Sequence, residues 1–282
     1  MKKFFAAVVA FVALNTATAQ QQNESGETQH KIDESSFLKK GKIFVFYGWN
    51  RSWYGNSDIN FSGNGYQFQL NGVHATDRPS PFGWDYVNPA WFTVTQYDFR
   101  IGYFLRKDLA LVLGIDHMKY VMKQDQTVGF SGTISDPHYA AMVQNGQVDL
   151  SNSEFLTFEH TDGLNYENIG IEKYKSLINH KNLELVWSYG AGLGFMFPKS
   201  NVKLFGNERS DRFHVAGMGT DARASLNLIL AKHWMVRLEG KAGYINMWDI
   251  KTTLNNKPDK ARQDFVFGQV LAGIGYTFNT KK

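Results

Sequence analysis

The residues best suited to chemistry lie in residues 158–172, where a histidine and an aspartate stand two positions apart. Side chains alternate sides along a strand, so His160 and Asp162 share a face if this stretch is extended. Such a pair can activate a water molecule by general base catalysis. Covalent hydrolysis would also need a nucleophile beside the base, and we expect no serine or cysteine near this pair.

The same stretch resembles part of the small outer-membrane lipid A deacylases (acyloxyacyl hydrolases). That family carries His-x-Ser-Asn followed by Asn-x-Gly, and Asn168-Ile-Gly170 matches the second part. Asp162 stands where the family has its nucleophilic serine. The resemblance therefore implies lipid deacylation as an alternative function, and we assign no catalytic residue from it.

The other histidines do not form a site in the sequence. Asp116 and His117 are consecutive, so a strand places them on opposite faces. Two further pairs lie in polar loops without a third ligand nearby, and we interpret them as surface residues: His74 with Asp77, and Asp136 with His138.

No cofactor or metal site is predicted. The chain has no cysteine, which excludes thiolate chemistry and disulfides. The glycines between Gly190 and Gly194 alternate along a strand pattern and do not form a phosphate-binding turn. We therefore expect no catalytic, cofactor-binding or metal-binding residue, and an enzyme is the less favoured reading.

The elements that would position these side chains are strands, and the last stretch, residues 265–278, is the clearest. Its apolar residues recur at every second position, which is the period of a strand. Val266, Val270, Ala272, Ile274, Tyr276 and Phe278 share one face. Gln269, Gly273 and Gly275 share the other, with Phe265, Phe267 and Leu271 as exceptions. The closing Tyr276-Thr-Phe278 resembles the assembly signal of outer-membrane barrels.

The chain contains eight such segments, of which the stretch just described forms the last: residues 42–54, 93–105, 109–122, 154–177, 182–197, 213–230, 234–250 and 263–278. Short connections (106–108, 179–181, 231–233) alternate strictly with long ones (55–92, 123–152, 198–212, 251–262). Outer-membrane barrels have short periplasmic turns and long outer loops. We therefore predict an all-β fold, an antiparallel transmembrane barrel of eight strands. We expect the first long connection to hold its own hairpin within residues 59–70. Ten strands is the alternative if residues 55–73 cross the membrane as a pair or if Asp162-Gly163 divides the segment 154–177, although that second break alone would spoil the alternation of short and long connections.

The face opposite the apolar one carries charge. On the eight-strand reading the inward charged residues are Asp98, Arg100, Asp116, Glu159, Glu184, Asp221, Arg223, Arg237, Glu239 and Lys241. Buried charges must pair, and a barrel of this size has little lumen beyond its own side chains. We expect a salt-bridged interior; a narrow ion path is the alternative.

The start of the chain predicts export. Lys2 and Lys3 precede an apolar run, and Ala17-Thr18-Ala19 forms a small-residue cleavage site. We expect residues 1–19 to be a signal peptide, cleaved near Ala19, and residues 41–280 to be an outer-membrane barrel. Residues 20–40 are expected to be a flexible periplasmic lead-in, with a short plug of the lumen as the alternative.

Composition agrees with this class. Aromatic residues make up 15% of the 282 residues and glycine contributes 26, while mean hydropathy is −0.35 because lumen and loops would be polar. The net charge of +4 is mild, and we expect no nucleic-acid partner. A soluble sandwich or lipocalin-like barrel is the alternative fold.

Several motifs resemble those of a group of bacteroidete outer-membrane proteins related in kind to small OmpA- or OmpX-like barrels. They lie at residues 57–63, 114–121, 158–166, 212–217 and 243–246, and the similarity spans roughly residues 41–280. The resemblance implies location and fold, not a reaction. We expect a structural or surface-interaction role, with lipid modification and a small-solute channel as alternatives. The expected partners are outer-membrane lipid, the barrel-assembly machinery and a ligand at the outer loops.

Overall fold

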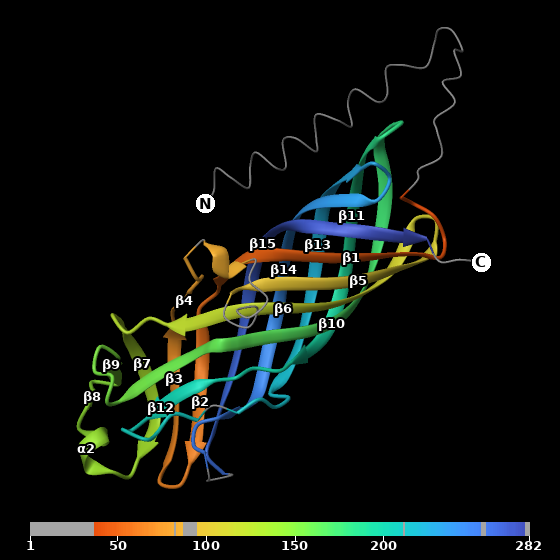
Figure 1. Ribbon diagram of the computed structural model, residues 1–282. Coiled ribbons are helices and arrows are strands. Elements are labelled where there is room, and N and C mark those ends of the chain that lie inside the picture. Colours follow the sequence, from red (N-terminus) through yellow and green to blue (C-terminus); the bar gives the residue numbers. More distant parts are fainter. Residues whose placement is uncertain (1–36, 82, 87–94, 211, 255–257, 280–282) are drawn as a thin grey trace, which may run out of the picture. The chain divides into compact units, whose positions relative to one another are not determined.

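Strands pair in antiparallel order around a closed ring in the computed structural model, which describes residues 37–81, 83–86, 95–210, 212–254 and 258–279. All of these belong to the unit Glu34–Lys282. Within the described residues the ring consists of β1 (Lys42–Tyr54), β5 (Tyr97–Arg106), β6 (Leu109–Met122), β10 (Leu156–His180), β11 (Leu183–Met196), β13 (Gly217–Leu230), β14 (Trp234–Lys251) and β15 (Lys260–Asn279). Figure 1 shows these strands running obliquely around the ring.

The first and last strands close the ring. β1 pairs with β15 without interruption, from Lys42 opposite Asn279 to Tyr54 opposite Phe267. Because β1 and β15 pair with each other, neither presents the unpaired backbone groups that the edge strands of an open sheet would have. The expected eight-stranded antiparallel barrel is therefore confirmed.

One end of the barrel carries the short turns, and we call it the short-turn end. Ala231 and Lys232 adopt the left-handed conformation in the turn between β13 and β14. The β10–β11 turn falls at residues 181–182 instead of 179–181, because pairing continues to His180 opposite Leu183. β13 begins at Gly217, four residues later than expected, where its pairing with β11 and β14 begins.

The opposite, long-loop end carries an extension of the sheet (Figure 1). The expected hairpin is confirmed as β2 (Ser57–Gly63) and β3 (Tyr66–Val73), and it continues the sheet beside β15. The extension also contains β4 (Ala75–Asp77), η2 (Trp84–Tyr86), β7 (Thr127–Ile134), α2 (Pro137–Ala140), β8 (Val143–Gln144), β9 (Gln147–Asp149) and β12 (Asn201–Leu204).

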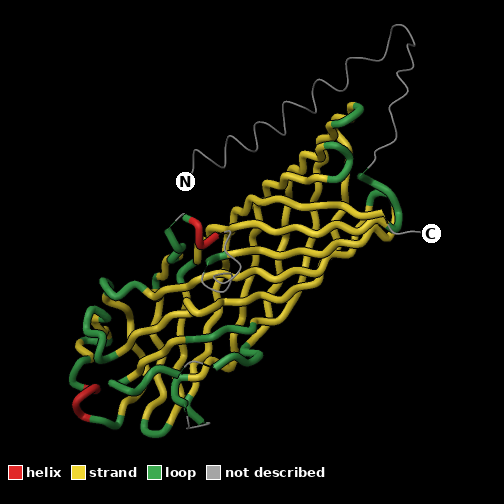
Figure 2. The backbone as a smooth tube through the Cα atoms, viewed as in Figure 1, coloured by secondary structure: helices red, strands yellow, loops and turns green. Residues whose placement is uncertain are grey.

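Two connections expected as loops thus contain strands, and that part of the prediction is wrong. β7 pairs with β3, and β12 pairs with the start of β10, so both gain backbone partners from distant parts of the chain. Figure 2 shows the strands of the extension continuing the lattice of the barrel wall. The polarity of residues 123–152 concealed β7, because only one face of this strand is covered.

The interior is layered along the barrel. Inward residues of β14 run from the short-turn end as Met235, Arg237, Glu239, Lys241, Gly243, Ile245 and Met247. Met235 belongs to a buried apolar cluster at the short-turn end, and Ile245 and Met247 belong to a larger one at the long-loop end. Charge therefore lies between two apolar layers, which we call the short-turn cluster and the long-loop cluster.

The three apolar exceptions in the last strand are explained by this layering. Phe265 and Phe267 point into the long-loop cluster and Leu271 into the short-turn cluster. Their neighbour Gln269 faces inward between the two clusters, at the level of Lys241. The described residues contain no helix long and apolar enough to cross a membrane.

Candidate functional site

The charged layer of the lumen is built around Arg100, Arg223 and Arg237. The Arg100 guanidinium lies 2.5 Å from Asp116, 3.6 Å from Asp98 and 3.8 Å from Glu239. The ammonium of Lys241 contacts the second oxygen of Asp116. All five side chains are almost fully buried, so each charge is balanced by neighbours in place of water.

Arg237 and Arg223 extend this network across the lumen. Arg237 lies 2.9 Å from Glu172 and also contacts Glu239. Arg223 donates to both oxygens of Asp221, at 2.7 and 2.9 Å, and lies 3.7 Å from Glu172. Strands β5, β6, β10, β13 and β14 are thereby tied together by ion pairs inside the barrel.

The predicted inward set is nearly complete. Nine of its ten members are buried: Asp98, Arg100, Asp116, Glu184, Asp221, Arg223, Arg237, Glu239 and Lys241. The tenth, Glu159, lies in the extension, where it pairs with Arg78 at 3.3 Å and accepts from Asn201 at 2.6 Å. Its assignment to the lumen is wrong, because Glu159 lies on the opposite face of β10 from its buried neighbours Phe158 and His160.

Glu172 was missed. It is 1% exposed and accepts from Arg237 and from the Tyr174 hydroxyl. The signal was present in the alternation, because Ile169 and Ile171 face outward and therefore leave Gly170 and Glu172 facing inward.

Apolar clusters cover both sides of the charged layer. At the short-turn end Phe37 is fully buried, with its ring 5.2 Å from that of Phe104 and 5.8 Å from that of Tyr174. Phe37 and Leu38 come from the segment expected as a flexible lead-in, whose residues 20–36 lie outside the described residues, as does the expected signal peptide. At the long-loop end Tyr120 and Phe158 are among the buried aromatics of the other cluster.

His160 has a different partner from the one expected. Its Nδ1 lies 2.6 Å from the Ser200 hydroxyl, and its Nε2 lies 3.4 Å from the Gln263 carbonyl oxygen. The expectation that no serine lies near His160 is therefore wrong: Ser200 is forty residues away in sequence but adjacent in space. All three side chains are buried, and an amide occupies the place where a catalytic acid would orient the imidazole.

Asp162 does not join His160. Its carboxylate lies 3.2 Å from the Lys199 ammonium and 2.5 Å from the Arg209 guanidinium. The strand is irregular here, since Gly163 has a φ of 134° and the pairing of β10 with β6 shifts between His160 and Leu164. This break in the alternation is why two residues two positions apart do not act together.

His117 and His138, the next histidines considered from the sequence, lie apart from His160. His117 lies with its ring stacked on Tyr97 and its Nδ1 2.7 Å from Asn165, away from the partners of Asp116. His138 is exposed and lies 3.1 Å from Glu154. Within the described residues no group of three metal-ligating side chains could hold a metal ion.

Asp77 in β4 is a structural carboxylate, whereas His74 is exposed and its backbone bonds to Gln126. The Asp77 carboxylate accepts from the backbone amides of Ser52 and Arg78, both at 3.0 Å, and from the side chain of Gln96. Burial nonetheless raises the pKa of Asp77 above its usual range, with these hydrogen bonds opposing the shift.

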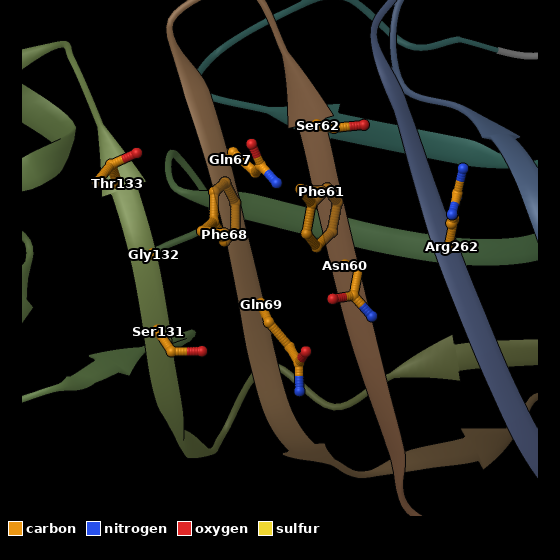
Figure 3. Close-up of a pocket in the computed structure, with 10 residues that line it drawn as sticks. All are labelled: Asn60, Phe61, Ser62, Gln67, Phe68, Gln69, Ser131, Gly132, Thr133 and Arg262. Atoms are coloured by element: carbon orange, nitrogen blue, oxygen red, sulfur yellow. The ribbon is translucent and has the colours of Figure 1, made fainter.

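A second candidate site is a groove on the outer face of the extension, with a volume of about 700 Å³ (Figure 3). Strands β2, β3, β7 and β15 form it. Its lining residues are Asn60, Phe61, Ser62, Gln67, Phe68, Gln69, Ser131, Gly132, Thr133 and Arg262. Phe61 and Phe68 are buried beneath it, with their rings stacked at 4.9 Å, so the groove presents amides, hydroxyls and one guanidinium.

Comparison with known proteins gives only distant similarity. No protein-family model and no curated protein matches the chain. Among solved structures, the outer membrane protein OprG from Pseudomonas aeruginosa is 10% identical over 87% of this chain and 99% of its own, with a TM-score of 0.43. The outer membrane protease OmpT from Escherichia coli is 12% identical over 84% and 97%, with a TM-score of 0.40. Ail, the attachment invasion locus protein of Yersinia pestis, is 10% identical over 85% and 99%, with a TM-score of 0.32.

Proposed function

We propose that this chain is an outer-membrane β-barrel with a closed lumen. Its role would be structural, and its extension would be exposed at the cell surface for interaction with other molecules. The observation that carries the proposal is the charged layer sealed between two apolar clusters. Arg100, Arg237 and Glu172 are at most 1% exposed and form mutual ion-pair chains. An open ion path would need water beside these charges.

The outer wall of the barrel supports a membrane environment. Large apolar side chains are exposed on every ring strand, among them Trp53, Ile101, Leu113, Ile171, Leu193, Leu226, Leu238 and Ile274. A continuous apolar surface around a whole barrel exceeds what a soluble monomer exposes. Lipid would cover it.

The spacing of aromatic residues on β14 supports the same conclusion. Its outward positions are Trp234, Val236, Leu238, Gly240, Ala242 and Tyr244. The aromatic residues at the two ends are separated by about the length that a strand needs to cross a bilayer, roughly 9–11 residues. Aromatic side chains favour both membrane interfaces.

The strand ends also suggest how the barrel is assembled and oriented. Tyr276 and Phe278 lie on the outer face near the end of β15, where the barrel-assembly machinery would meet them. The short-turn end would face the periplasm and the extension the exterior.

The first test is the electrophoretic mobility of protein folded in detergent, with and without boiling. A closed barrel resists unheated detergent, so we expect a shift on boiling. Planar bilayers containing the folded protein should then show no steady conductance. An unshifted protein that is monomeric without detergent would contradict the proposal and favour a soluble barrel.

A further inference from the structure

The outer groove is built from two rows of side chains that cross the strands. In the first row Arg262 is opposite Asn60, Asn60 is opposite Gln69, and Gln69 is opposite Ser131. In the second row Ser62, Gln67 and Thr133 are opposite one another, and Lys260 stands beside Ser62. Neighbouring strands lie about 4.8 Å apart and the rows about 7 Å apart. Figure 3 shows the side chains of both rows around the groove, except that of Lys260, which is not part of the lining.

The chemistry of the rows matches a polyhydroxylated ligand. Amides and hydroxyls both donate and accept hydrogen bonds, as sugar hydroxyls do. Gln69 is fixed in place, because its Nε2 donates to Asn71 at 2.6 Å and to Asp58 at 3.3 Å. A side chain held this way loses little freedom when a ligand binds.

Arg262 favours a ligand that carries a negatively charged group. It is the one charged residue in the lining of this groove, and it stands at the end of a row. A guanidinium offers paired donors to a carboxylate or sulfate group. Two carboxylates lie nearby but already have donors: Asp58 accepts from Gly72, and Asp264 accepts from the Tyr244 hydroxyl.

We propose that this groove binds an oligosaccharide that carries an acid group beside Arg262. The inference rests on the proposed function, since the groove then faces the cell exterior. Other occupants fit less well. The lining offers no exposed aromatic ring on which nucleobases could stack, and no apolar stripe for an amphipathic helix.

The test uses the full-length mature protein folded in detergent micelles and calorimetric titration with matched sugars. Oligogalacturonate supplies carboxylates, and its methyl ester is the neutral match. A sulfated dextran oligomer with neutral dextran forms a second pair. We expect at least one acid form to bind about tenfold more tightly than its neutral match, equivalent to about 1.4 kcal/mol.

Variants locate the site. Arg262→Gln should remove the tenfold preference for acid and leave the neutral sugar's affinity unchanged. Gln67→Ala should weaken both forms by a similar factor. Arg106→Gln changes another exposed arginine, at the short-turn end, and should change neither affinity. The acid preference should also weaken as salt rises.

Two results would overturn the inference. One is the absence of binding by both acidic probes at millimolar concentration. The other is an acid preference that survives Arg262→Gln. In either case a retained mobility shift on boiling would show that the barrel itself is intact, so the failure would belong to the ligand and not to the proposed function.

Discussion

Arg100 shows at the level of one residue how the lumen is held closed. Its guanidinium faces three carboxylates, those of Asp98, Asp116 and Glu239, in a layer without exposure to solvent. Removing the Arg100 guanidinium alone would leave these three carboxylates buried without the cation that compensates their negative charge.

Replacing Arg100 by methionine should therefore destabilise the barrel by about 3–5 kcal/mol, as expected when one partner of a buried ion pair is lost. Urea unfolding in micelles would measure the change. The exposed Arg106→Met variant is the matched control and should shift the free energy of unfolding by less than about 0.5 kcal/mol. A small effect of Arg100→Met would mean that water reaches the charged layer.

The buried Ser200–His160 contact gives a second prediction at this scale. Ser200→Ala leaves His160 Nδ1 without its partner, so we expect a loss of about 1–3 kcal/mol in stability. We expect no change in the mass of lipid A in cells that express the wild-type protein, because both side chains are closed off from substrate. A change in lipid A mass that disappears on His160→Ala would instead favour the deacylase alternative.

At the scale of elements, the chain before β1 takes part in the barrel. Phe37 enters the short-turn cluster and contacts the rings of Phe104 and Tyr174. One aromatic side chain from outside the ring thus completes a layer that the strands form only in part.

Phe37→Ala should lower the free energy of unfolding by about 3–5 kcal/mol, the cost of emptying a buried aromatic site. It should not create a conductance, because the charged layer lies behind it. Urea unfolding and planar-bilayer recordings test the two parts. The neighbouring exposed Lys39→Ala is the control for stability. A steady current through Phe37→Ala would show that Phe37, not the charged layer, closes the lumen.

At the scale of the whole molecule, the outer surface changes from apolar around the ring to polar on the extension. Leu238 lies on the outer wall between Trp234 and Tyr244, whereas Thr133 lies on the polar face of the extension. A new charge should therefore destabilise the protein at the first surface and not at the second.

Leu238→Arg should destabilise the protein in phospholipid vesicles by about 2–4 kcal/mol, since a cation would face the middle of the bilayer. Thr133→Arg, on a solvated face, should change the free energy of unfolding by less than about 0.5 kcal/mol. Unfolding in vesicles measures both. Equal effects would contradict the proposed membrane position of the ring.

The sequence by itself determined the ring. Alternation along β1, β6 and β15 and the strict order of short and long connections gave eight strands, because period two and turn length are local properties. The same alternation identified nine of the inward charges. Only the tertiary structure decided which of them pair, that Ser200 reaches His160, and that polar segments such as β7 and β12 are strands. Each of these depends on contacts between residues far apart in the chain. The irregularity at Gly163 also breaks the alternation of β10, so the side on which Asp162 lies could not be inferred from the sequence.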